Sequence, residues 1–211
     1  MAAKLFEYPI IDWVIRRCIK SKKINKLIVA TSEKLENDFI AERARYYGVD
    51  SFRGSENNVL SRFHKIGNFE SPDLIVRICA DNPLISSTEI DRLIKFSIKN
   101  KLDYAFNHIP ALNNNYLDGA GAEIFTFKTL EIIQKNAFSI EHKEHVTKYI
   151  WDNLDIFKID VLSAPVHLNY PKIRLDIDQK SDLFKIRELL SKLKNFKHPE
   201  DVSLISLEKF F

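Results

Sequence analysis

The sequence predicts an α/β fold: a three-layer sandwich in which helices cover both faces of a mostly parallel sheet. Two observations carry this prediction. Short apolar runs rich in β-branched residues alternate with amphipathic stretches of helical period along the whole chain. The chain has 211 residues, is 45% hydrophobic and contains no linker or low-complexity segment, so it suits one sizeable core. We therefore expect residues 1–211 to form a single domain.

Each expected element has its own local signal. Pro9 suits the start of a helix, Gly48 suits the end of one, and Ser86 with Glu89 forms a capping box. The expected strands cover residues 26–31, 49–53, 76–80, 103–107, 122–127, 157–162 and 172–178. The expected helices cover residues 10–19, 38–47, a stretch from 59 onward, 90–98, 129–136, 141–151 and 182–193.

The composition indicates which kinds of binding partner and which cellular compartment to expect. The chain carries 32 basic and 29 acidic residues, and this near balance gives little support for a dedicated nucleic-acid surface. Two cysteines, Cys18 on an apolar helix face and Cys79 in a strand, indicate reduced thiols rather than a disulfide framework. No signal peptide and no apolar run of membrane-spanning length is present. We expect a soluble, cytoplasmic protein with neither a nucleic-acid nor a membrane partner.

Two carboxylates end expected strands. Asp81 closes the apolar run 76–80, and Asp178 closes 172–178. Carboxyl ends of parallel strands meet at one sheet edge, where two such carboxylates could share one Mg²⁺. The bland interpretation of Asp81 is a simple Asp-Asn-Pro turn. Asp176 competes as the second ligand, and Arg174 is its candidate partner.

Three further groups are candidates for binding. Arg53, Ser55 and Arg62 suit a phosphate or base contact, although an ordinary surface turn is equally compatible. The run 141–145 has two imidazoles three positions apart; its order differs from a zinc protease motif, so it is either a solvated helix or a substrate-facing helix start. Glu123 lies in an otherwise apolar strand and therefore needs a partner such as an arginine or a ligand hydroxyl.

Several segments, taken in order, resemble the nucleotidyltransferases that activate sugars or sugar acids with CTP, particularly the branch named for spore-coat polysaccharide biosynthesis. The similar segments are residues 9–15, 28–32, 52–55 with 59, 60 and 62, 76–85, 144–147 with 149, and 174–182. The resemblance implies a Rossmann-related, glycosyltransferase-A-like sandwich that transfers a nucleoside monophosphate from CTP and releases pyrophosphate. It also implies roles for individual residues: Asp81 and Asp178 as catalytic Mg²⁺ ligands, Arg53, Ser55, Arg62 and Ala80 near the nucleotide, and Asn107, Glu123, Glu144 and His145 near the sugar.

One departure from the family pattern bears on activity. Family members begin with a strand and a loop rich in Arg, Gly, Ser and Lys that cradles the triphosphate, and residues 1–8 contain neither. The count of 5 glycines agrees with that loss. We expect residues 1–211 alone to bind CTP weakly and to release no pyrophosphate above background. The alternative is a non-catalytic sugar- or nucleotide-binding protein or subunit. The tail Phe210-Phe211 is a candidate contact for a homodimer.

Overall fold

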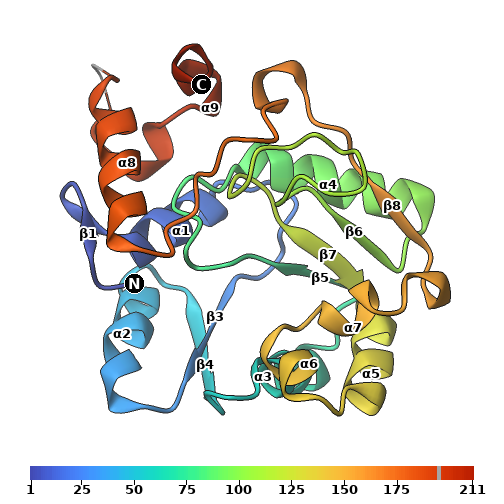
Figure 1. Cartoon of the computed structure of the whole chain (residues 1–211). Helices are drawn as coiled ribbons and strands as arrows, with labels where there is room; N and C mark the ends of the chain where they lie inside the picture. Colours follow the sequence, from blue (N-terminus) through green and yellow to red (C-terminus); the bar gives the residue numbers. More distant parts are fainter. Residues whose placement is uncertain (194–195) are drawn as a thin grey trace.

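The computed structural model describes residues 1–193 and 196–211, and its strands and helices confirm the α/β class (Figure 1). The strands are β1 (Lys4–Leu5), β2 (Tyr8–Pro9), β3 (Ile28–Ser32), β4 (Asp50–Gly54), β5 (Leu74–Arg77), β6 (Tyr104–Phe106), β7 (Glu123–Thr126) and β8 (Ile159–Val161). The helices are α1 (Ile10–Ile19), α2 (Asp38–Tyr46), α3 (Val59–Glu70), α4 (Ser87–Asn100), α5 (Phe127–Asn136), α6 (Ile140–Glu144), α7 (Lys148–Trp151), α8 (Lys180–Ser191) and α9 (Leu204–Leu207).

The strands beyond the short β1–β2 pair form two separate sheets. Strands β3 and β4 pair in parallel, and a four-stranded sheet has the order β5-β7-β6-β8. Strand β7 runs antiparallel to both of its neighbours, whereas β6 and β8 are parallel, so the larger sheet is mixed. The apolar pattern locates a strand but carries no information about its direction, and the reversal of β7 therefore had no signal in the sequence.

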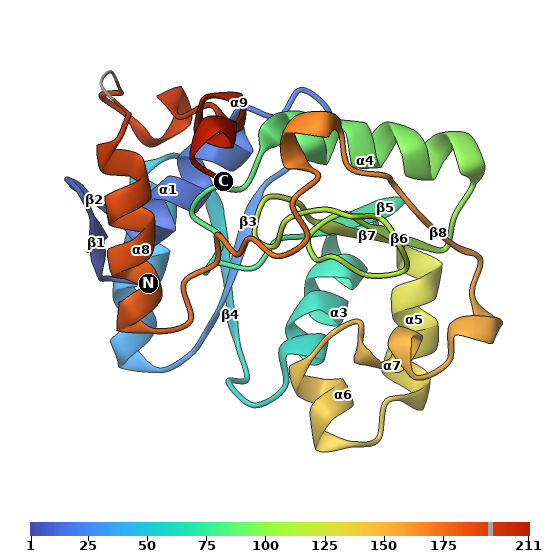
Figure 2. The same cartoon turned by 45° about the horizontal axis from the view of Figure 1, so that its top comes forward.

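Helices lie on both faces of the larger sheet, as the three-layer prediction required (Figure 2). Side chains alternate along a strand, so successive residues enter different cores. Ala105 and Ile124 pack with the residues of α1 and α4. Tyr104 and Phe125 pack on the other side with residues of α3 and α5, including Leu130.

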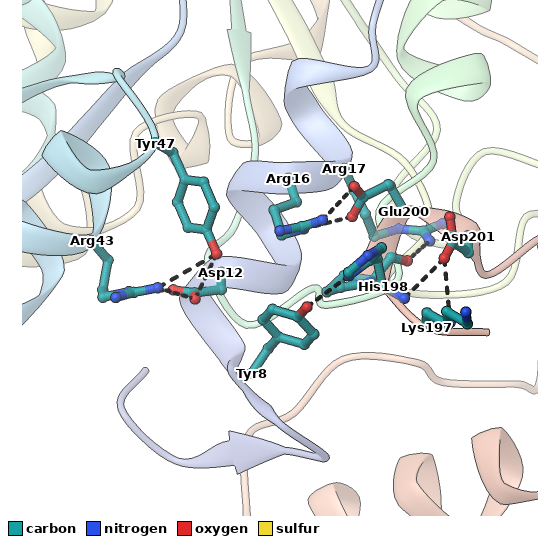
Figure 3. Close-up of polar contacts among 11 residues, drawn as sticks. Tyr8, Asp12, Arg16, Arg17, Arg43, Tyr47, Lys197, His198, Glu200 and Asp201 are labelled. Carbon is teal, nitrogen blue, oxygen red and sulfur yellow. Dashed lines mark hydrogen bonds and ion pairs between the residues drawn. The ribbon is translucent and has the colours of Figure 1, made fainter.

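Helix α1 ties distant parts of the chain together through charged side chains (Figure 3). The carboxylate of Asp12 is fully buried and accepts hydrogen bonds from Arg43 Nε at 2.8 Å and Tyr47 Oη at 2.8 Å, both near α2. On the next turn of α1, the guanidinium of Arg16 donates two hydrogen bonds of 2.6 Å to Glu200. These contacts fix α1 against α2 and the C-terminal segment.

A second arginine of α1 completes this attachment. Arg17 is buried, and its guanidinium donates to the backbone oxygens of Pro199 and Val202 at 2.8 Å and of Ile85 at 2.6 Å. Nearby, the hydroxyl of Tyr8 lies 2.7 Å from His198 Nδ1 (Figure 3). Nothing in the sequence predicted this docking, because Arg17 and its partners in the C-terminal segment, Pro199 and Val202, are more than 180 positions apart.

Two predicted elements are wrong. Residues 172–178 form no strand: the Leu175 amide donates to Asp118 O and the Ile177 amide to Asp81 O, each at 2.9 Å, so no continuous ladder with one partner can form. The helix expected over 141–151 is broken into α6 and α7, because Thr147 between them turns inward and donates to Glu123 at 2.5 Å. Among the described helices, none combines the length and the apolar character that crossing a membrane requires.

Candidate active site

Three segments that are far apart in sequence meet beyond the end of β5. Asp81 lies in the turn after β5, Asp118 lies in the long loop between β6 and β7, and residues 174–178 pass between them, bonded to both. Gly119 permits this close packing: its φ is +87°, and a Cβ there would lie 2.7 Å from the backbone nitrogen of Asp176. The crossing therefore gathers four aspartates: the proposed pair Asp81 and Asp178, their competitor Asp176, and Asp118.

One guanidinium, that of Arg174, contacts three of these four carboxylates. Arg174 Nη2 donates to Asp178 at 2.8 Å, and Arg174 Nε donates to Asp176 at 3.0 Å. Arg174 Nε also lies 3.7 Å from the Asp118 carboxylate. The predicted pairing of Arg174 with Asp176 is thus present, and the same side chain also holds Asp178. Negative charge remains in excess at this site.

Burial and mutual repulsion change the acidity of the cluster. The pKa of Asp81 is raised, first by burial and then by the charges of Asp178 and Asp176. Its Oδ1 atom is shielded from solvent and has no hydrogen-bond partner among the described residues. Burial and the charge of Asp176 raise the pKa of Asp118 to about 6. Asp118 was missed because it falls in a loop, and the only local signal was its position before Gly119.

The carboxylate oxygens of this cluster would suit a divalent cation that is also coordinated by a bound substrate. Within residues 1–193 and 196–211, no group of three or more His, Cys, Asp or Glu side chains has an arrangement that could hold a metal. A cation held by two carboxylates would therefore keep oxygen ligands from phosphate and water, as Mg²⁺ commonly does. The unpartnered Oδ1 atom of Asp81 is the observation that favours such a ligand.

Two of the predicted nucleotide-side residues, Arg53 and Ser55, lie at the carboxyl end of β4. Arg53 donates to the backbone oxygens of Ser32 at 3.1 Å and Lys34 at 2.8 Å, which fixes the turn after β3. Ser55 is exposed just after β4, and Ala80 is exposed beside Asp81. This arrangement leaves the Ser55 hydroxyl available to a ligand, while Arg53 is partly committed to the protein.

Arg62 lies on the neighbouring helix α3 and is more enclosed. Its Nη1 atom donates to Ala30 O at 3.4 Å, whereas its Nε atom is buried without a partner among the described residues. Burial lowers the pKa of Arg62. A guanidinium with one unsatisfied donor remains suited to an anion.

Glu123 has the arginine partner that its buried position demanded. It pairs with Arg77 directly across the β5–β7 ladder and accepts hydrogen bonds from Tyr104 at 2.6 Å and Thr147 at 2.5 Å. Burial alone would raise its pKa, but the charge of Arg77 and these hydrogen bonds bring the pKa of Glu123 down to about 2. His108, which the sequence did not single out, lies close enough for Glu123 to influence its pKa.

The other predicted substrate-side residues differ in burial: one is buried and two are exposed. Asn107 is fully buried, and its amide donates to Glu89 O at 3.2 Å and accepts from the Ala122 amide at 2.8 Å. It therefore holds the ends of its own loop in place. Glu144 and His145 are exposed at the end of α6.

Comparisons with known proteins agree with this architecture. Residues 2–204 match the profile of the family described as Cytidylyltransferase. The uncharacterized protein MJ1063 of Methanocaldococcus jannaschii is 42% identical over 183 residues, which is 87% of this chain and 72% of that protein. The spore coat polysaccharide biosynthesis protein SpsF of Bacillus subtilis is 29% identical over 187 residues, 87% of this chain and 76% of SpsF.

Solved structures show the same relationship. A cytidylyltransferase from Leptospira borgpetersenii superposes with a TM-score of 0.87 at 26% identity, covering 99% of this chain and 85% of its own. CMP:2-keto-3-deoxy-manno-octonic acid synthetase, solved with CTP, shares the fold with a TM-score of 0.64 at 14% identity, covering 90% and 91% of the two chains. Since the family profile spans nearly the whole sequence, this chain belongs to the cytidylyltransferase family.

Proposed function

We propose that this protein transfers a cytidylyl group from CTP to a sugar acid or sugar phosphate in cell-surface polysaccharide synthesis, with Mg²⁺ as cofactor. One observation carries the proposal. Four aspartates, Asp81, Asp118, Asp176 and Asp178, lie together, and the guanidinium of Arg174 pairs with only three of them, which leaves a surplus of carboxylate oxygens. Such oxygens suit a hard cation that carries phosphates. SpsF and the synthetase solved with CTP support the choice of pathway and nucleotide.

In the proposed reaction, an oxygen of the acceptor attacks the α-phosphorus of CTP. The new O–P bond forms as the bond to the bridging oxygen breaks, and pyrophosphate leaves. Mg²⁺ held by Asp81 and Asp178 would neutralise charge on the α-phosphate and on the leaving group. Asp81 has a free oxygen for this purpose, and Asp178 is bonded to Arg174 through Oδ2 alone, which leaves its Oδ1 atom for the cation.

The remaining predicted residues would either contact the nucleotide or the acceptor, or hold the surrounding structure in shape. The nucleotide would lie near Arg53, Ser55, Arg62 and Ala80, since ligands of open α/β sheets bind beyond the carboxyl ends of strands. On the acceptor side we propose Asn107, Glu123, Glu144 and His145. Glu123 and Asn107 already use their polar atoms within the protein, so they would hold this region in shape. Glu144 and His145 would touch the acceptor.

Calorimetric titration with CTP, in Mg²⁺ and in EDTA, tests the proposal on the chain itself. We expect weak binding that Mg²⁺ tightens roughly tenfold, which corresponds to about 1.4 kcal/mol. Asp81→Asn and Asp178→Asn should each remove most of this gain, because an amide lacks the charge that a hard cation prefers. Asp155→Asn, at an exposed carboxylate outside the cluster, is the matched control and should keep it. Equal CTP affinity in Mg²⁺ and EDTA would contradict the proposal.

A pyrophosphate-release assay with CTP and a panel of sugar acids and sugar phosphates then tests turnover. For residues 1–211 alone we expect no release above background, in line with the weak binding. Release that requires UTP, ATP or GTP rather than CTP would overturn the cytidylyl assignment.

A further inference from the structure

His108 is a polar side chain that the proposed reaction leaves unused. It follows β6 by two residues, and its Nδ1 atom is shielded from solvent without a hydrogen-bond partner among the described residues. Shielded polar atoms of folded proteins are nearly always hydrogen-bonded, so an unsatisfied one needs an explanation. A group of a bound ligand is one partner that would satisfy this nitrogen.

The strand register places His108 on the same face of the larger sheet as Glu123. Strands β5 and β6 both run antiparallel to β7, so their carboxyl ends lie at one edge, where Arg77 and Phe106 lie on either side of Glu123. The His108 ring meets the Phe106 ring edge-on, with the ring centroids 5.7 Å apart. The charges of Glu123 and Arg77 both act on the pKa of His108. These contacts make His108 a neighbour of the Glu123 network.

The residues proposed to touch the acceptor reach this same face. Thr147 donates a hydrogen bond to Glu123 at 2.5 Å, and it follows Glu144 and His145 in the chain by only a few positions. Figure 2 shows α6 and α7, which flank this segment, on the same side of the larger sheet as α3 and α5. His108 therefore belongs to the acceptor side of the candidate active site.

The backbone around His108 is fixed beside the aspartate cluster. Its carbonyl oxygen accepts a hydrogen bond of 3.0 Å from the amide of Gly119, the residue that follows Asp118. The preceding residue, Asn107, donates its amide to Ala122 O at 3.0 Å and accepts from the Ala122 amide at 2.8 Å. A side chain on such a fixed base is already in position when a ligand arrives, which lowers the entropic cost of binding.

The charges around His108 favour an uncharged ligand group. The guanidinium of Arg77 is paired with the carboxylate of Glu123, so together they carry no net charge. Burial lowers the pKa of His108, so its imidazole is neutral at pH 7. An anionic group would meet no surplus positive charge from these three residues. A hydroxyl, in contrast, can either donate to or accept from a neutral imidazole nitrogen.

We propose that His108 determines acceptor specificity, with its Nδ1 atom hydrogen-bonded to a neutral hydroxyl of the acceptor sugar. This inference rests on the proposed function, since it requires an acceptor at this site. The acidic group of the acceptor would lie away from His108, and the reacting oxygen would lie toward the aspartates. A sugar without the hydroxyl would leave the nitrogen unsatisfied, and buried polar groups reject analogues in this way.

Nuclear magnetic resonance of protein with ¹⁵N-labelled histidine rings tests the contact. The probes are a panel of hexuronic acids, keto-deoxy sugar acids and hexose phosphates, each up to roughly 50 mM, well above the Kd of a weak millimolar site. At least one probe should shift the Nδ1 resonance of His108. The ring of His198, which lies 2.7 Å from the Tyr8 hydroxyl in the α1 cluster, is the internal control and should not shift.

Three results of this experiment would overturn the inference. The first is a sugar that shifts the amides of Glu144 and His145 but leaves the His108 ring unchanged. The second is a panel in which no probe shifts the His108 ring. The third is an equal shift caused by inorganic phosphate, which would show that the nitrogen meets an anion.

Two substitutions separate hydrogen bonding from shape. His108→Leu removes both ring nitrogens and should weaken binding of the sugar that shifts His108 by roughly tenfold, the cost of one lost hydrogen bond at a shielded site. His108→Asn places an amide atom near the position of Nδ1 and should keep the affinity within a few-fold of the wild type. Equal affinity of His108→Leu and the wild type, or equal losses in the two variants, would overturn the inference.

The CTP titration separates failure of this inference from failure of the proposed function. Mg²⁺-dependent CTP binding without any sugar effect on the His108 ring would overturn the inference alone. A sugar that shifts the His108 ring in a chain that binds no CTP would support the hydroxyl contact and contradict cytidylyl transfer.

Discussion

Two polar clusters of this chain differ in whether their carboxylates are paired with positive groups. Around α1, the buried Asp12 is matched by Arg43 and the hydroxyl of Tyr47. Beyond β5, three of four aspartates share Arg174, and the fourth, Asp81, keeps an oxygen without a partner among the described residues. Matched charges in a buried site hold distant elements together, and breaking one pair is costly. Carboxylates without a positive partner destabilise the fold locally, but their oxygens can bind a cation.

The largest expected effect comes from breaking the matched cluster. Asp12→Asn keeps the shape of the side chain but leaves the charge of Arg43 without its partner, so we expect the free energy of unfolding to fall by about 3 to 5 kcal/mol. Urea denaturation measures this loss. Asp178→Asn removes one of the surplus carboxylates and should not lower the urea midpoint. Similar losses in the two variants would show that the clusters do not differ as described.

A smaller effect is expected from pH. The pKa of Asp118 is about 6 in the folded chain, against about 3.9 for an unfolded aspartate, so the folded state binds its proton more tightly. The stability due to this proton is complete below about pH 4 and is lost as pH rises through 6, by about 1 to 3 kcal/mol. Urea midpoints measured in EDTA between pH 4 and 7 should fall in the wild type. In Asp118→Asn this decline should be reduced, and an unchanged slope would rule out Asp118 as its source.

The smallest expected effect concerns Arg174, the arginine that several of these carboxylates share. In Arg174→Gln, the carboxylates of Asp178 and Asp176 lose their guanidinium partner, so we expect Mn²⁺ affinity, followed by electron paramagnetic resonance, to rise a few-fold. The gain is modest because Arg174 is exposed and solvent screens its charge. Arg187→Gln removes a half-buried arginine of α8 that donates to Lys4 O and lies outside the cluster, and should leave Mn²⁺ affinity unchanged. Weaker Mn²⁺ binding in Arg174→Gln would show that Arg174 supports the site instead of competing for it.

Local patterns in the sequence determined much of the fold. The helix expected over 10–19 is α1, and Ser86 caps α4 through a 3.3 Å contact with the Glu89 amide. The sequence also predicted that Glu123, in an otherwise apolar strand, must be paired. Each of these follows from periodicity, capping or burial, which act over a few neighbouring residues.

Other features were decided only by the tertiary structure. Arg77 is the partner of Glu123 because β5 and β7 pair in one particular register. Residues 172–178 lost their predicted strand because their amides serve both Asp81 and Asp118. The sequence by itself specified most of the helices and strands, and it specified that Glu123 needs a partner. Packing alone decided which distant segments met, because pairing register and loop crossings depend on contacts that no local pattern encodes.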